Sequence, residues 1–148
     1  MSSPCRAAAL RFLKIRPRSV HELRVKLAGK GFSVKEIDES IEHLKSMDLL
    51  NDRVFADGWI RYRLARPFGF VRIIGELQEK GIADELINRA VAQARGEYQE
   101  TGAALEFACR RAQRLGNMEP HQRRKKVFDF LIRRGFPEDV AMKVLKNI

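Results

Sequence analysis

The chain has 148 residues, and its 29 Lys or Arg side chains outnumber 19 Asp or Glu, which gives a formal net charge of +10 at pH 7. The apolar run near the N-terminus is broken by Arg11 and Lys14, so we expect neither a targeting segment nor a membrane span, and we predict a cytoplasmic protein without membrane contact. Cys5 and Cys109 are too few and too far apart in sequence for a disulfide framework or a CxxC metal site.

Three helices are expected in the first 50 residues. The first contains the apolar stretch at residues 7–15 and ends at Arg16-Pro17, because proline disfavours continued helix. The second begins after Ser19-Val-His-Glu22 and the third after Ser33-Val-Lys-Glu36, and both segments have the spacing of a capping box. Between them stands Lys30-Gly31, where glycine permits the left-handed conformation that closes a helix.

A second group of helices repeats this order. Asn51-Asp52 provides an N-cap for a helix that contains the apolar stretch at residues 55–64 and ends before Arg66-Pro67. A further helix ends at Lys80-Gly81, and the next one begins at Asp84-Glu85, two acidic residues that suit a helix N-terminus.

The third group matches less closely at its start. Its first helix is expected over residues 102–115, with an end near Gly116-Asn117. Glu119-Pro120 opens the next helix and Arg134-Gly135 closes it. No stretch of the sequence shows sustained two-residue alternation, so we predict no sheet.

The closing glycines mark a repeat. Gly31, Gly81 and Gly135 are 50 and 54 residues apart (81 − 31 and 135 − 81). Apolar residues lie eight and four positions before each glycine and six and ten positions after it, which places each pair on one helix face. These residues are Leu23, Leu27, Ile37 and Ile41; Ile73, Leu77, Ile87 and Val91; and Val127, Leu131, Ala141 and Leu145.

We therefore predict an all-α protein of about nine helices, organised as three tandem three-helix repeats at residues 1–50, 51–100 and 101–148. The junctions at 48–52 and 96–102 are short and polar, which favours an extended array with some hinge freedom.

The positive charge is unevenly distributed. The net charges of the three repeats are +4, 0 and +6 (10 − 6, 8 − 8 and 11 − 5). The densest basic stretches are residues 110–114, 123–126 and 133–134, and a further group surrounds the Pro-Gly turn near residue 68. A polyanion is the natural partner of such clusters, although solvated helix surfaces explain them about equally well.

No catalytic motif is evident. Acidic pairs such as Asp84-Glu85 lie in helix first turns, where capping explains them, and not in the convergent arrangement that a metal-dependent hydrolase needs. None of the glycine turns fits the phosphate loop GxxxxGK[ST], and the three histidines are scattered singly. We predict that the protein is not an enzyme and uses no metal or cofactor.

The sequence resembles the RecX family of bacterial regulators over nearly its whole length. The resemblance is strongest over residues 16–91 and rests on the order and spacing of several segments. These are Ser19-Val-His-Glu22-Leu23, Lys30-Gly31, Leu50-Asn51-Asp52-Arg-Val-Phe55-Ala56, Arg63, Gly69-Phe-Val-Arg72-Ile73 and Glu76-Leu77-Gln-Glu-Lys80-Gly81-Ile82. The chain departs from the family pattern at Phe70, where proline is frequent, and at Asn51, where an acidic residue is frequent.

The resemblance implies a regulator of the RecA recombinase, with a role in recombination, DNA repair and the SOS response. Members of the family bind the RecA filament on single-stranded DNA, lodge in its groove or cap its growing end, and so inhibit its recombinase, ATPase and co-protease activities. For this chain it implies the RecA filament as partner and weak, non-specific binding to single-stranded DNA. No long heptad run argues for a coiled-coil dimer, so we expect a monomer.

We predict that cations make the contact with the filament or DNA. The strongest candidates are Arg123, Arg124, Lys125 and Lys126, because four consecutive cations cannot all serve one helix end. The other candidates are Arg133, Arg134, Arg66, Arg72, Lys80 and Lys30. Lys30, Lys80 and Arg134 are also expected to serve as helix-closing residues, and Arg72 could equally neutralise a neighbouring helix start.

An aromatic set at helical spacing, Phe55, Trp59 and Tyr62, favours core packing over base stacking. Two further functions stay open. Trios of short helices with glycine turns resemble helix-turn-helix units, which makes a non-specific DNA-binding module the main alternative, although acidic residues in the helix over 34–44 oppose phosphate contact. The other open function is that of a scaffold that joins two proteins without contacting nucleic acid.

Overall fold

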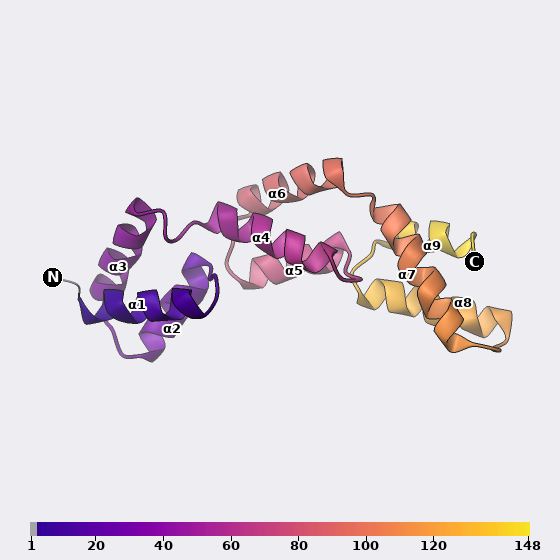
Figure 1. The fold of residues 1–148 in the computed structure, drawn as a ribbon, viewed down its shortest axis with the longest axis horizontal. Coiled ribbons are helices and arrows are strands. Elements are labelled where there is room, and N and C mark those ends of the chain that lie inside the picture. Colours follow the sequence, from indigo (N-terminus) through magenta and orange to yellow (C-terminus); the bar gives the residue numbers. More distant parts are fainter. Residues whose placement is uncertain (1–2) are drawn as a thin grey trace.

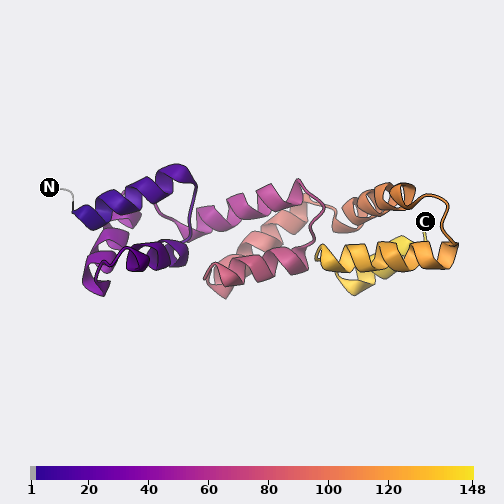
Figure 2. The same cartoon turned by 90° about the horizontal axis from the view of Figure 1, so that it is seen from below.

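The structure is a computed structural model that describes residues 3–148. Nine α-helices and no strand occur within that range. The helices are α1 (Pro4–Ile15), α2 (Val20–Gly29), α3 (Val34–Ser46), α4 (Asp52–Leu64), α5 (Phe70–Glu79), α6 (Asp84–Glu97), α7 (Glu100–Leu115), α8 (Pro120–Arg133) and α9 (Glu138–Leu145). They form three successive trios that lie in a row, with the two ends of the chain at opposite ends of the molecule (Figure 1, Figure 2). The predicted all-α array of three-helix repeats is confirmed.

Each trio has an apolar core of its own. The first core draws its residues from the range 5–50, the second from 55–98 and the third from 104–148. Helices accordingly pack mainly within their own trio, and the residues four positions apart that precede each closing glycine are fully buried in all three. Since each core is small, we expect the repeats to depend on contacts with their neighbours.

Local signals set the helix ends as predicted. The hydroxyls of Ser19 and Ser33 accept the N–H groups of Glu22 and Glu36, and each glutamate accepts the N–H of its serine, which completes two capping boxes. Asn51 caps α4 by accepting two backbone N–H groups. The three closing glycines have φ values of 74° to 92°, the left-handed region that side chains disfavour.

The prediction was wrong in three details. α7 begins at Glu100 and not at Gly102, and the Glu100 carboxylate accepts the Phe70 N–H at the start of α5, a contact that the sequence does not reveal. In α9 Val144 is fully buried while Leu145 is only partly buried against the same core, since residues three and four positions after Ala141 share one helix face. Tyr62 is half exposed and not packed in the core, unlike Phe55. No helix in the described part of the chain is long and apolar enough to cross a membrane.

Candidate functional site

Neighbouring repeats meet at two joints built on one plan. In the first joint the start of α2, Ser19–Glu22, meets the turn Lys80-Gly81 that follows α5. In the second joint the start of α5, Gly69–Arg72, meets the turn Arg134-Gly135 that follows α8. The start of one repeat's second helix thus receives the closing turn of the next repeat.

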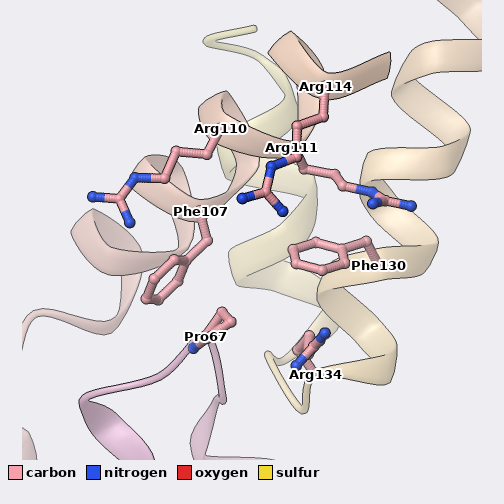
Figure 3. A pocket seen from close by; sticks show the side chains of 7 residues that line it. All are labelled: Pro67, Phe107, Arg110, Arg111, Arg114, Phe130 and Arg134. Atoms are coloured by element: carbon pink, nitrogen blue, oxygen red, sulfur yellow. The ribbon is translucent and has the colours of Figure 1, made fainter.

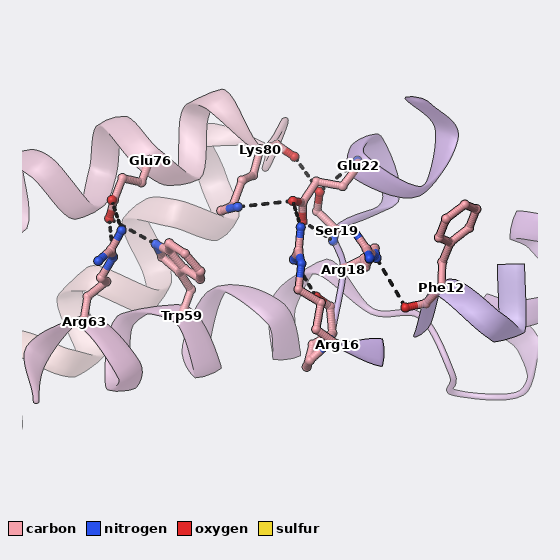
Figure 4. A network of polar contacts seen from close by, with 10 residues as sticks. Phe12, Arg16, Arg18, Ser19, Glu22, Trp59, Arg63, Glu76 and Lys80 are labelled. Atoms are coloured by element: carbon pink, nitrogen blue, oxygen red, sulfur yellow. Dashed lines mark hydrogen bonds and ion pairs between the residues drawn. The ribbon is translucent and has the colours of Figure 1, made fainter. Parts of the chain in front are cut away.

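In the first joint the charged side chains form ion pairs with one another (Figure 4). Ser19 Oγ donates to the Lys80 carbonyl at 2.7 Å, and the Val20 N–H donates to Asp52 Oδ1 at 2.8 Å. Glu22 Oε2 accepts from Lys80 Nζ at 3.2 Å and from Arg16 Nη2 at 2.7 Å. Burial raises the pKa of Glu22, but the hydrogen bonds from Arg16, the Ser19 N–H and Lys80 outweigh it and lower the pKa to about 2.

The second joint brings the same positions together but joins them by backbone hydrogen bonds, where the first joint uses the Ser19 hydroxyl. The Gly69 N–H donates to the Arg134 carbonyl at 2.7 Å, and the Val71 N–H donates to the Gly135 carbonyl at 2.9 Å. The Phe70 N–H donates to Glu100 Oε2 at 2.9 Å, as the Val20 N–H donates to Asp52 in the first joint. These N–H groups lie at a helix start, where they have no intrahelical partner, so the next repeat satisfies them.

Side chains distinguish the two joints. Arg72 occupies in the second repeat the position that Glu22 occupies in the first, nine residues before the closing glycine. The guanidinium carbons of Arg72 and Arg134 lie 4.6 Å and 5.2 Å from the centroid of one ring, Phe68. Arg72 donates to the Arg133 carbonyl at 3.3 Å and reaches Glu76 only at 3.8 Å. Glu76 is already bound by Arg63 and by the Trp59 indole N–H, as Figure 4 shows.

An arginine-lined groove opens beside the second joint. One cavity, of about 250 Å³, lies between the Pro67 turn, α7 and α8 (Figure 3). An adjoining cavity of about 430 Å³ shares Arg111, Phe130 and Arg134 with it. We call the two cavities together the arginine groove. Its lining consists of Arg72, Arg110, Arg111, Arg114, Arg133 and Arg134, with Pro67, Phe68, Phe107 and Phe130.

None of the described residues that line the arginine groove carries a carboxylate. Among the described residues, no acidic side chain lies within 4.0 Å of Arg111, Arg114, Arg133 or Arg134. Arg111 stacks over Phe130 at 5.3 Å, and its Nε is buried without a hydrogen-bond partner. A guanidinium offers several donors in one plane, which suits paired hydrogen bonds to an oxyanion, and the rings hold these side chains in place.

The structure sorts the predicted cations into different settings. It brings Arg72, Arg133 and Arg134 together in the arginine groove. Lys80 is paired in the first joint and lies 4.4 Å from the Trp59 ring centroid, and Arg66 lies 4.4 Å from the Tyr62 ring centroid. Lys30, Arg124, Lys125 and Lys126 are exposed, and Arg123 donates to the Gly116 carbonyl. None of this second set lines the groove.

Sequence reasoning missed several groove residues as site residues. Arg110, Arg111 and Arg114 stood out only as a basic stretch, and Phe68, Phe107 and Phe130 were not singled out at all. The 50-residue register was the available signal, because it aligns Arg72 with Glu22 and so exposes a change of charge at one joint position.

Comparison with known proteins gives one answer along the whole chain. Residues 5–44, 51–91 and 97–145 match, in order, the first, second and third three-helix domains of RecX. The chain is 33% identical over 141 residues to "Regulatory protein RecX" of Prosthecochloris aestuarii, covering 95% of this chain and 90% of that protein. It is 34% identical over 143 residues to the protein of the same name from Pasteurella multocida, covering 95% and 86%.

The fold is likewise similar to a solved one. The crystal structure of RecX from Lactobacillus salivarius superposes with a TM-score of 0.82 over 97% of this chain and 93% of that chain. The identity between the two sequences is 24%, so this likeness concerns the fold alone.

Proposed function

This chain belongs to the RecX family of regulatory proteins, and we propose that it regulates a RecA recombinase by binding the filament that RecA forms on single-stranded DNA. In this proposal it inhibits the recombinase, ATPase and co-protease activities, either by lodging in the filament groove or by capping the growing end. The protein would act as a cytoplasmic, non-enzymatic monomer in recombination and the SOS response.

The arginine groove is the observation that carries the proposal. It presents six arginines beside three phenylalanine rings, without a carboxylate in its lining. Phosphate oxygens of a DNA backbone are suitable ligands for such donors, and aromatic or guanidinium planes can stack on unpaired bases.

The shape of the molecule supports a filament as the target. Three repeats in a row form an elongated body, which suits contact with more than one protomer of a helical filament (Figure 1). Contacts at several repeats would add through effective concentration if their spacing matches the filament. The cations at 123–126 would then contribute a second basic surface, and the net charge of +10 would speed association and make it salt-dependent.

The test is the DNA-dependent ATPase rate of the cognate RecA, with the protein titrated in at amounts below one molecule per protomer. We expect inhibition well below stoichiometry, weakened by Arg134→Ala and by changing residues 123–126 to alanine. Lys143→Ala is the matched control, because it removes one exposed cation outside the groove. An unchanged rate with the wild-type protein would contradict the proposal.

A DNA-binding module without a recombinase partner is the second candidate function. The same arginine groove favours it, since phosphate contact needs no protein partner. The first turns of α6 and α9 are acidic, which opposes insertion of these helices into a DNA groove. Equal affinity for bare DNA and for the filament would favour this candidate.

A further inference from the structure

We propose that the second joint binds a phosphate group of single-stranded DNA in the place that a carboxylate fills in the first joint, and that the bound phosphate holds the second and third repeats together. This inference rests on the proposed function, because it takes the DNA of the filament as the source of the phosphate.

The two joints supply an internal comparison. In the first joint Glu22 lies between two cations, Arg16 and Lys80, and accepts hydrogen bonds from both. The corresponding residues one repeat later are Arg66, Arg72 and Arg134. In the sequence register the plan keeps both cations and replaces the central carboxylate by Arg72. In space only Arg72 and Arg134 of these three line the groove, because Arg66 lies over the Tyr62 ring. An oxyanion from outside would restore the charge pattern of the first joint.

The side chains of the second joint are arranged to hold such an anion. Arg72 and Arg134 lie 4.6 Å and 5.2 Å from the centroid of the same Phe68 ring. Of the two, only Arg72 has an ion pair among the described residues, a 3.8 Å contact with Glu76, which Arg63 also binds. The buried Nε of Arg111 supplies a further donor without a partner in the same groove. Like charges that line one cavity repel one another, and a shared anion removes that repulsion.

A phosphodiester chain suits the groove better than a protein carboxylate. The arginines continue beyond the joint to Arg114 and Arg110 on α7, so the groove offers successive cations, of which Arg110 is paired with Glu106 at 2.6 Å. Single-stranded DNA brings a phosphate with each nucleotide and bases that can stack on Phe107 or Phe130. A single carboxylate would neutralise one arginine pair and leave the remainder of the groove unfilled.

Binding would act on the contacts between repeats. The N–H groups of Gly69 and Val71 donate to the carbonyls of Arg134 and Gly135, so the residues that bind the phosphate also form these bonds. Without the anion, repulsion between Arg72 and Arg134 favours opening of the joint. A bound anion would stabilise the closed joint that these two hydrogen bonds form, so the relative orientation of the two repeats becomes coupled to DNA occupancy.

The experiment is amide hydrogen exchange on the full chain, with oligo-deoxythymidylate or inorganic phosphate added and with chloride at matched ionic strength as the reference. We expect either addition to slow exchange at Gly69 and Val71 by about tenfold, the order of one charge-assisted hydrogen bond. The Val20 amide, in the first joint, serves as the internal control and should not respond.

Two variants sharpen the test. Arg72→Glu restores the charge pattern of Glu22 and Lys80, so the joint amides should be protected without any anion and unaffected by oligonucleotide. Arg72→Gln removes the repulsion without restoring a carboxylate, so its joint amides should respond weakly to either addition. Exchange in the three apolar cores of each variant shows that the repeats stay folded.

The results separate this inference from the proposed function. If anisotropy shows that the oligonucleotide binds but amide exchange at Gly69 and Val71 is not slowed, the joint proposal is overturned and the filament-binding proposal is unaffected. Slowing by phosphate and oligonucleotide together with an unchanged RecA ATPase would support the joint and contradict the filament role. Equal protection by poly-glutamate and by oligonucleotide would overturn the assignment to phosphate.

Discussion

Glu22 and Arg72 occupy the same position in consecutive repeats, at the start of the helix that receives the next repeat's closing turn, yet they carry opposite charges. Around Glu22 the joint is closed by ion pairs to Arg16 and Lys80. Around Arg72 the corresponding helix start and closing turn also meet, but the neighbouring side chains of the groove are arginines and phenylalanines. The contact between neighbouring repeats is therefore neutralised by ion pairs at the first joint and borders the arginine groove at the second joint.

The ion pairs of Glu22 predict acid sensitivity at the first joint. Its pKa falls from 4.5 to about 2 in the folded protein, so its contribution is present above pH 4.5 and is lost as the pH falls toward 2. We expect Glu22→Gln to lower the free energy of unfolding by about 1–2 kcal/mol at pH 7, and by less at pH 3, because the partners are partly solvated. Urea unfolding at both pH values measures this, and an equal loss at the two values would contradict it.

Gly135 should tolerate no side chain. Its φ of +92° is strained for any other residue, and an added Cβ would collide with the backbone of Arg72. We expect Gly135→Ala to cost about 1–3 kcal/mol in thermal unfolding and to expose the joint amides to exchange. Gly58→Ala is the matched control.

Gly58 lies on an exposed face of α4 with open space around an added Cβ. This control should therefore be neutral or stabilise the protein by up to about 1 kcal/mol, since alanine favours helix. A stable Gly135→Ala variant with slow joint exchange would show that the close approach to Arg72 is unnecessary.

The ionised Glu100 carboxylate should lower the stability of the folded protein at neutral pH. Burial raises the pKa of this carboxyl, and the Phe70 N–H and Arg95 offset the rise only in part. Because the folded pKa is raised, the contribution of the group is favourable at low pH and is lost as the pH rises through that pKa. We expect Glu100→Gln, whose amide oxygen can still accept from Phe70, to raise the melting temperature at pH 7, and the difference from wild type to shrink at pH 4. The exposed Glu97→Gln change is the control, and a lower melting temperature for Glu100→Gln at pH 7 would count against this account.

Arg111 should contribute to DNA affinity through phosphate contact. We expect Arg111→Ala to weaken binding to single-stranded DNA similarly for all sequences and to reduce the slope of log affinity against log salt by about 1. Anisotropy titrations over a salt series measure both quantities, with Lys143→Ala as the charge-matched control. Loss of DNA affinity without a change in the salt slope would indicate a structural role for Arg111, through its stacking on the Phe130 ring.

Much of the fold could be predicted because its signals act over a few residues. The capping boxes at Ser19 and Ser33 and the turns at Gly31 and Gly81 involve neighbours within one helical turn. The burial predictions were wrong where tertiary packing decides which of two adjacent residues is fully buried, as at Val144. They were also wrong at Tyr62, an aromatic residue that lies outside the core. The boundaries after residues 50 and 100 stay a prediction.

The sequence by itself determined the nine helices of residues 3–148 and the three-repeat order, because local hydrogen bonds and apolar spacing encode them. Its composition alone fixed the excess of positive charge. Only the tertiary structure decided which cations are neutralised. Ser19 and Lys80, like Arg72 and Arg133, meet across 61 residues of chain. Coulomb interactions depend on distance in space, and the docking of one repeat on the next sets that distance for Lys80 beside Glu22 and for Arg134 beside Arg72.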